Sequence, residues 1–165
     1  REQEVKVVLY LPIGTVLFAD NNTYSYHSNS SHYKDILNNG DILLIRQFRY
    51  GPREEFIEIP AGKLDKNEEP LKCGLRELEE ETGYKSNKLT FLTNIHPAIG
   101  FSNEKMWMYL AEELELSEKK LEDDEFLELL PTPLNVALEW VFSGKITDVK
   151  TIIGILWMKE LKFNH

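Results

Sequence analysis

Residues 62–84 read GKLDKNEEPLKCGLRELEEETGY, and we expect the rest of the chain to be arranged around them. Pro70 suits the first turn of an α-helix and Gly83 suits the position just past its end, so the stretch predicts a helix between these two residues. At about 100° per residue, one side of this helix carries the side chains of Leu71, Leu75, Leu78 and Thr82.

The other side of the same helix is expected to carry three carboxylates, those of Glu77, Glu80 and Glu81. Glu77 and Glu81 are four residues apart, so their carboxylates should lie one turn apart and repel each other. That repulsion costs roughly a few tenths of a kcal/mol, and a bound divalent cation would reverse it. Ligands made only of oxygen suit Mg²⁺ or Mn²⁺ rather than Zn²⁺. Taken alone, an acidic helix face is more often simply solvated, so the metal interpretation depends on the surrounding spacing.

The spacing of the stretch is more specific than its charge. Five residues separate Gly62 from Glu68, seven more precede Arg76-Glu77-Leu78, and Glu80-Glu81 and Gly83 follow after gaps of one residue each. This pattern resembles the Nudix box, although Tyr84 stands where an aliphatic residue is commoner. The resemblance implies hydrolysis of a diphosphate linked to another group, and it leaves that group unidentified.

The resemblance also implies which residues of the box bind metal and take part in catalysis. The implied metal ligands are the carbonyl of Ala61 and the carboxylates of Glu77, Glu80 and Glu81, with Mg²⁺ as the cofactor and Mn²⁺ as the alternative. Glu80 and Arg76 are carried over as catalytic residues. Arg76 can hold carboxylates in a fixed fork geometry, and Glu68 in the loop before the helix can reach it.

Three stretches outside the box resemble the ADP-ribose pyrophosphatase branch of the family. They are residues 44–50 with 58–62, residues 97–104 followed by MWMYLA, and residues 124–128 with the tail GKITDVKTIIGILW. This resemblance covers about residues 41–157, and it implies that Arg49, Glu58 and Glu104 contact the substrate. A guanidinium is a bidentate phosphate donor, so Arg49 would grip the diphosphate.

The resemblance further implies a catalytic carboxylate after the acidic run, and Glu125 is our first choice. Asp123 and Asp124 are substitutes because the alignment of this loop is uncertain by a residue or two, and Glu104 is a fourth candidate. The expected substrate is a nucleoside diphosphate sugar, with ADP-ribose giving AMP and ribose 5-phosphate. The alternatives are a GDP-sugar, another nucleotide sugar or a dinucleotide, or a nucleotide-sensing domain without catalysis, which the intact box disfavours.

Composition narrows the class of protein and its partners. The 165 residues amount to about one domain, and 42% hydrophobic with 28% charged residues is ordinary for a soluble globular protein. The net charge of −9 argues against nucleic acid or an anionic membrane as a partner. Cys73 is the single cysteine, so no internal disulfide can form. The sequence has no run of 18 apolar residues and no signal-peptide pattern, which predicts a cytoplasmic location.

The order of the elements predicts the fold class. Strands are expected at Val5–Leu11, Thr15–Ala19, Asp41–Phe48, Phe56–Ile59, Lys88–Ile95, Lys105–Ala111 and Phe126–Leu130. A long loop is expected at Asp20–Gly40, and helices at Pro133–Phe142 and from Asp148 to about Leu161. Strands on both sides of a central helix, with helices at the end, predict an α/β (α+β) sandwich.

The resemblance specifies this fold as a Nudix α/β/α sandwich with a mixed central sheet, plus N-terminal β-strands. It implies that residues 1–40 form N-terminal strands and a loop of the same domain and serve in dimerisation. Residues 41–165 would be the Nudix hydrolase domain, and the expected assembly is a homodimer.

Overall fold

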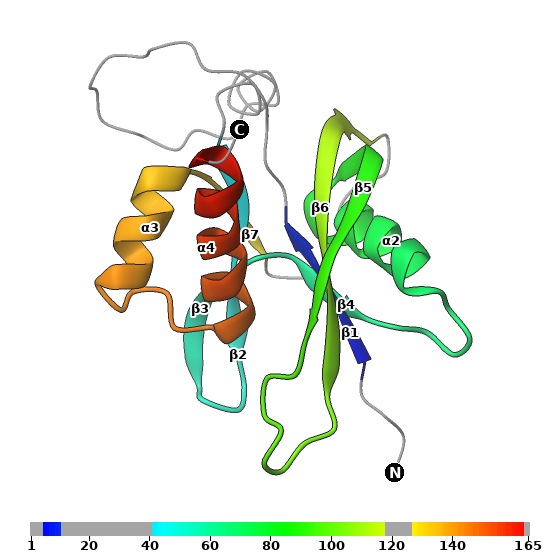
Figure 1. Ribbon diagram of the computed structural model, residues 1–165, viewed down its shortest axis with the longest axis horizontal. Helices are drawn as coiled ribbons and strands as arrows, with labels where there is room; N and C mark the ends of the chain where they lie inside the picture. Colours follow the sequence, from blue (N-terminus) through cyan, green and yellow to red (C-terminus); the bar gives the residue numbers. More distant parts are fainter. Residues whose placement is uncertain (1–4, 11–40, 118–126, 164–165) are drawn as a thin grey trace.

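The computed structural model describes residues 5–10, 41–117 and 127–163 (Figure 1). The strand expected at Thr15–Ala19, the loop expected at Asp20–Gly40 and the candidate Glu125 with its substitutes Asp123 and Asp124 lie outside these residues. None of the helices in the described ranges has the length and hydropathy that a membrane crossing requires.

The described strands form two sheets. The first has four strands, β4 (Ala61–Lys63), β1 (Val5–Tyr10), β6 (Lys105–Leu116) and β5 (Tyr84–Ile95), in that spatial order. This sheet is mixed, because β1 runs parallel to β6, whereas the pairs β1–β4 and β5–β6 are antiparallel. The second sheet is antiparallel and consists of β3 (Glu54–Glu58), β2 (Asp41–Arg49) and β7 (Glu128–Pro133), also in spatial order.

The helices lie on two sides of these strands. In Figure 1, α3 (Leu134–Phe142) and α4 (Val149–Phe163) lie at one end of the molecule, and α2 (Pro70–Thr82) lies at the other. The strands lie between them, so the expected mixed α/β fold with helices outside strands is confirmed. The strands are shared between two sheets, and only the sheet next to α2 is mixed.

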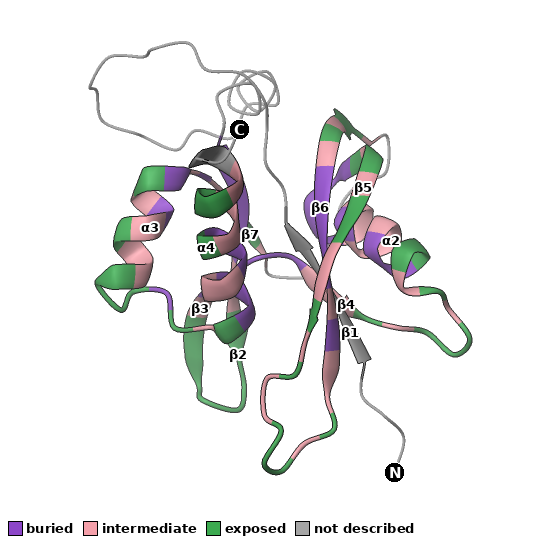
Figure 2. Ribbon diagram, viewed as in Figure 1, coloured by how far each residue is buried: buried purple, intermediate pink, exposed green. Residues whose placement is uncertain are grey.

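Two strands separate two hydrophobic cores. In β2, Ile42 and Leu44 belong to the core that also contains residues of α3 and α4, whereas Leu43 belongs to the core under α2. In β6, Met108 faces the first core and Tyr109 the second. Side chains alternate across a strand, so a strand covered on both faces is apolar at every position. This explains the unbroken run ILLI in β2, and Figure 2 shows the buried residues concentrated on the inner strands.

The motif helix begins and ends where the sequence predicts. Pro70 occupies its first turn, and Gly83 follows its end in the left-handed conformation, with φ 71°. The Gly83 N–H donates a hydrogen bond to the Glu79 carbonyl over 2.9 Å, which satisfies one of the last free carbonyls of the helix.

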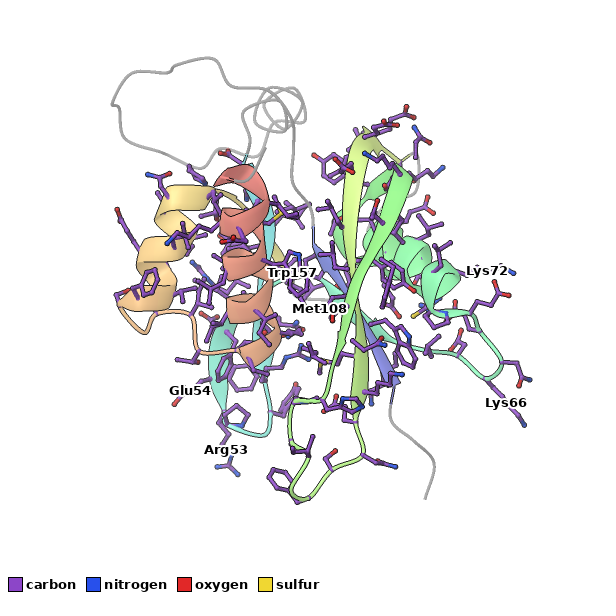
Figure 3. All side chains as sticks on the ribbon, viewed as in Figure 1. Arg53, Glu54, Lys66, Lys72, Met108 and Trp157 are labelled. Carbon is purple, nitrogen blue, oxygen red and sulfur yellow. The ribbon has the colours of Figure 1, made fainter. Side chains whose placement is uncertain are left out.

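The predicted faces of this helix need two corrections. Leu71 is 45% exposed, because the first turn lies at the outer end of the helix, where Lys72 points away from the molecule (Figure 3). Glu81, which was expected on the side opposite the leucines, is only 8% exposed, so this side of the helix is not simply solvated. Glu81 is only about 60° around the helix from the buried Leu78, which explains why it shares the inner face.

Several strand boundaries differ from the prediction. The segment Ala61–Lys63 forms the strand β4 where a loop was expected. The strand expected at Lys88–Ile95 begins at Tyr84, and the strand expected to end at Ala111 continues to Leu116. The cause is visible in the register, where Lys88 pairs opposite Glu112 and their side chains form an ion pair of 2.6 Å. A lysine opposite a glutamate stabilises a strand pair that the acidic composition alone disfavours.

Candidate active site

Arg76 lies at the centre of the motif helix and contacts three carboxylates. Its Nε donates to Glu68 Oε1 over 2.9 Å, and its Nη2 donates to Glu68 Oε2 over 2.9 Å, which is the bidentate fork expected of this pair. Its Nη1 donates to Glu77 Oε1 over 2.7 Å and to Glu80 Oε2 over 2.8 Å. Nη2 also donates to the Lys63 carbonyl over 3.0 Å, which links the helix to β4.

These contacts change the ionisation of the groups around Arg76. The hydrogen bonds that Arg76 donates to Glu68 lower the pKa of Glu68 to about 2 and raise the pKa of Arg76. Burial, followed by the negative charges of Glu68 and Glu77, raises the pKa of the Cys73 thiol to about 12. Cys73 is therefore a protonated, structural thiol, and its Sγ–H donates to the Lys63 carbonyl over 3.4 Å.

The short strand β4 lies directly against the acidic side chains of α2. The Ala61 N–H donates a hydrogen bond to Glu81 Oε2 over 2.9 Å. A Cβ atom added at Gly62 would lie 1.7 Å from the Glu77 Cδ and 2.0 Å from its Oε1. A glycine is therefore required at position 62 for the Glu77 carboxylate to occupy its place.

The donors around β4 suit a hard divalent cation. They are the carboxylates of Glu77, Glu80 and Glu81 and the carbonyl of Ala61, all of them oxygens, and the space left by the missing Gly62 side chain holds the Glu77 carboxylate. Among the described residues, no three His, Cys, Asp or Glu side chains are already gathered as a cation cluster. Arg76 instead bridges two of these carboxylates, and it offsets their mutual repulsion.

A cavity of about 530 Å³ adjoins the Ala61–Gly62 segment. Its wall includes the three residues that the sequence predicts to contact substrate, Arg49, Glu58 and Glu104, together with Ala61 and Gly62. Glu81 acts electrostatically on Arg49 and raises its pKa, although the hydrogen bond from Arg49 to Glu58 is the larger cause. The structure thus places the cavity and the acidic helix side by side, with β4 between them.

A buried ionic network forms one side of this cavity. Arg49 Nε and Nη2 donate to Glu58 Oε1 and Oε2, each over 2.7 Å, and Glu58 is only 3% exposed. Lys150 Nζ donates to the same Glu58 Oε2 and, over 2.8 Å, to Asp148 Oδ2. Burial raises the pKa of Glu58, but the hydrogen bonds from Arg49 and the charge of Lys150 outweigh it and lower the pKa overall.

The same network reaches β3 and the first turn of α4. Asp148 Oδ2 accepts hydrogen bonds from the Thr151 N–H over 3.0 Å and from the Thr151 hydroxyl over 2.5 Å, so Asp148 caps α4 as the sequence suggested. The Thr151 Oγ1 accepts a hydrogen bond from the Ile59 N–H over 2.9 Å. Ile59 directly follows β3 and leads into the Ala61–Gly62 segment, so α4 holds that segment in place.

The sequence reasoning missed Lys150 and the placement of Asp148 in the wall of the cavity. One feature of the sequence could have indicated the role of Lys150. Lys150 is the second residue of α4, and a cation in the first turn opposes the helix dipole. Such a residue needs acidic partners, and the carboxylates of Asp148 and Glu58 are those partners.

Family models match most of the chain. The model of the NUDIX domain matches residues 35–146, and a model described as ToastRack found in some PspC matches residues 1–43. Within that second range, the described residues are 5–10 and 41–43.

Three relatives with known names are similar over most of their length. ADP-ribose pyrophosphatase of Bacillus subtilis (strain 168) is 43% identical over 126 residues, covering 75% of this chain and 68% of its own. The methanol dehydrogenase activator of Bacillus methanolicus is 36% identical with the same coverage. GDP-mannose pyrophosphatase of Escherichia coli O1:K1 / APEC is 33% identical over 133 residues, again covering 75% and 68%.

A solved structure shares the fold. It is described as an ADP compounds hydrolase, and it matches with a TM-score of 0.71 at 19% identity, covering 97% of this chain and 73% of that one.

Proposed function

Because the chain belongs to the Nudix family, we propose that it hydrolyses the diphosphate bond of a nucleoside diphosphate sugar, with ADP-ribose giving AMP and ribose 5-phosphate. The observation that carries this proposal is the cavity with Arg49 in its wall, separated from the acidic helix only by Ala61 and Gly62. A diphosphate in this cavity would meet the Arg49 guanidinium and would lie across β4 from the carboxylates of the helix. The choice of ADP-ribose rests on the similarity to the B. subtilis ADP-ribose pyrophosphatase.

Arg49 is the proposed diphosphate ligand. Two of its nitrogens, Nε and Nη2, donate to Glu58, and this leaves the Nη1 side of the guanidinium for a phosphate. Its side chain is 44% exposed, so it is open to a ligand that enters the cavity. Glu58 and Glu104 belong to the same cavity wall and are the further proposed substrate-binding residues, Glu58 through the two hydrogen bonds that it accepts from Arg49.

The proposed cofactor is Mg²⁺, with Mn²⁺ as the alternative. Glu77, Glu80, Glu81 and the Ala61 carbonyl would hold it, since their donors are all oxygens. When bound, the cation would offset the charge of the diphosphate and lower the pKa of a water molecule. Arg76 orients the carboxylates of Glu77 and Glu80 through its Nη1, which is the positioning that its proposed catalytic role with Glu80 requires.

The general base is proposed to be Glu125, with Asp123, Asp124 and Glu104 as substitutes. The motivation is position, because Glu125 follows an acidic run and directly precedes an apolar stretch. Glu104 is the described member of this set, and it lies in the cavity wall.

A substrate panel with product analysis tests the proposal. Purified protein is incubated with ADP-ribose, GDP-mannose, other nucleoside diphosphate sugars and dinucleotides, each with Mg²⁺, with Mn²⁺ and with a chelator. We expect ADP-ribose to have the highest kcat/KM, to give AMP and ribose 5-phosphate, and to need the metal. Similar or higher kcat/KM for GDP-mannose would favour the second candidate, which the similarity to GDP-mannose pyrophosphatase supports.

The same assay separates catalysis from sensing. A protein that binds ADP-ribose with a measurable Kd but turns over no member of the panel would be a sensor. The location and assembly stay predictions, namely cytoplasmic and homodimeric, and sedimentation at micromolar concentration tests the second of them.

A further inference from the structure

Lys150 is a buried lysine in the cavity wall that the proposed chemistry does not yet use. It is only 4% exposed, and its ammonium contacts the carboxylates of Glu58 and Asp148. We propose that Lys150 is a positioning residue for substrate binding, acting through Glu58 to hold Arg49 in the orientation that accepts the diphosphate. This inference rests on the proposed function, because it assigns Arg49 to the diphosphate.

Glu58 acts on the substrate through Arg49. Both of its oxygens accept hydrogen bonds from the fork of Arg49, and Oε2 also accepts one from Lys150. A carboxylate with both oxygens bonded to cations, at 3% exposure, is placed to orient Arg49 rather than to contact a sugar. These bonds fix the Nε–Nη2 edge of the guanidinium. Because the group is planar and rigid, they fix the orientation of the remaining Nη1 edge as well.

Lys150 also changes the charge that surrounds Arg49. If Glu58 faced Arg49 alone, one carboxylate would neutralise one guanidinium, and a phosphate would have to compete with it. Lys150 shares the Glu58 carboxylate, so the negative charge of Glu58 is divided between two cations. Asp148 takes up part of the Lys150 charge, and the remainder reduces the negative potential that Arg49 meets at Glu58. A neutral residue at position 150 could not have this effect.

A lysine at position 150 has an energetic cost. Lys150 lies in the first turn of α4, where the helix dipole disfavours a cation. Its long side chain is also almost fully buried, which is rare for lysine unless the charge is paired. Asp148 offsets both effects, because it caps the helix and binds the ammonium over 2.8 Å. The arrangement anchors the ammonium at Glu58 instead of leaving it to move.

The experiment compares substitutions at position 150 with a matched control on the same helix. We expect Lys150→Met to raise KM for ADP-ribose at least tenfold while kcat changes less than threefold. Lys150→Arg should recover most of the loss, since it keeps the charge. Lys159→Met removes an exposed lysine of α4 and should leave both constants unchanged.

A double variant separates positioning from a merely structural role. Lys150 acts through Arg49, so in an Arg49→Ala background Lys150→Met should change KM less than about twofold. Equal effects of Lys150→Met in both backgrounds would overturn the proposal, and so would a fall in kcat at constant KM. If Lys150→Met does not fold, Lys150→Gln keeps a hydrogen-bond donor without the charge and is expected to show the same rise in KM.

A binding measurement distinguishes this proposal from the proposed function. Calorimetry with α,β-methylene ADP-ribose and with inorganic pyrophosphate needs no turnover. We expect Lys150→Met to weaken both at least tenfold relative to wild type, and Lys159→Met to weaken neither. Unchanged affinities would overturn the role of Lys150 even if ADP-ribose is hydrolysed. Failure of the wild type to hydrolyse any substrate, with the affinity loss present, would overturn the function alone.

Discussion

Gly62 lies against the Glu77 carboxylate, and its lack of a side chain sets the distance between β4 and the motif helix. We expect Gly62→Ala to displace that carboxylate, because the new Cβ would lie 1.7 Å from Glu77 Cδ. Overpacking of this kind costs roughly 1–3 kcal/mol, which corresponds to a Tm lower by about 2–12 °C. Activity should fall at least tenfold beyond what the loss of stability explains, as measured by turnover well below the Tm.

Gly51 provides a matched control for this substitution. A Cβ atom at Gly51 meets nothing within 4 Å, and Gly51 lies in the turn between β2 and β3. Gly51→Ala should leave both Tm and turnover near wild type. Equal losses in the two variants would show that the effect of an alanine at Gly62 does not come from its contact with the Glu77 carboxylate.

Glu81 is the second residue whose role depends on its immediate surroundings. Glu81→Gln removes a charge from the cluster but keeps an oxygen that can accept the Ala61 N–H. We expect kcat to fall by at least about 100-fold, or ~2.7 kcal/mol in the barrier, while the metal-free Tm holds or rises slightly. Glu139→Gln, at an exposed position of α3, is the control. Activity within tenfold of wild type would remove Glu81 from the metal site.

At this scale the sequence predicted identities better than environments. The residue types of the box and their spacing identified Arg76, Glu77, Glu80 and Glu81, and the structure brings Arg76 together with Glu77 and Glu80. It grouped Glu81 with Glu77 and Glu80, although Glu81 is also only about 60° from Leu78, and it did not predict its hydrogen bond with the Ala61 N–H, which comes from a strand 20 positions away. A helical projection contains no information about such a partner.

Among the elements, the loop before α2 is attached to the helix by the bidentate ion pair between Glu68 and Arg76. The folded-state pKa of Glu68 is about 2, below its usual value of 4.5, because Arg76 donates two hydrogen bonds to it. The folded protein therefore binds fewer protons at this site than the unfolded chain. The stabilisation is complete above a pH of about 4.5 and is lost as the pH falls toward about 2.

Thermal unfolding as a function of pH tests this link. Wild type should have a higher Tm than Glu68→Gln at pH 6, and the difference should shrink steadily between about pH 4.5 and pH 2. Glu69→Gln alters the next residue, an exposed glutamate whose carboxylate lies 3.4 Å from Lys72 Nζ, and should show little difference at any pH. A Glu68 difference that stays constant with pH would contradict the assigned pairing.

The helices were predictable because their end signals are local. Pro70 and Gly83 delimit α2, and Asp148 begins α4, as the sequence indicated. The strands were less predictable from the sequence. β4 has three residues and forms only because β1 pairs with it, and β6 continues into acidic residues only because β5 lies opposite. Pairing across the chain decides both cases, and no local pattern reports it.

At the scale of the whole molecule, the proposed site combines segments that the sequence places far apart. The cavity wall draws on the ends of β2 and β3, the segment before β6 and the start of α4, while the motif helix supplies the carboxylates. The resemblance pointed to Arg49, Glu58 and Glu104 in this wall. Lys150 was missed because its contact with Glu58 joins residues 92 positions apart.

The identity of the general base is a prediction at the scale of the whole molecule, because the candidates lie in different segments of the chain. We expect Glu125→Gln to bind Mg²⁺ and ADP-ribose as wild type does, with kcat lower by roughly 10² to 10⁴. Asp123→Asn and Glu104→Gln are the comparison variants, measured with the same substrate and metal. A loss concentrated in either of them, with Glu125→Gln close to wild type, would move the base to that residue.

The position of β1 has a consequence for how the protein folds. β1 is the earliest of the described strands in the chain, yet Val8 pairs with Ala61 and Val5 with Lys105. Both partners follow β1 by a long stretch of chain, because the ladder with β4 needs the chain as far as Lys63 and the ladder with β6 needs it as far as Leu110. Contacts of such sequence separation carry a high loop-closure entropy and slow folding. The backbone that presents the Ala61 carbonyl is therefore expected to become rigid among the last parts of the molecule, after α2 has already formed from local contacts.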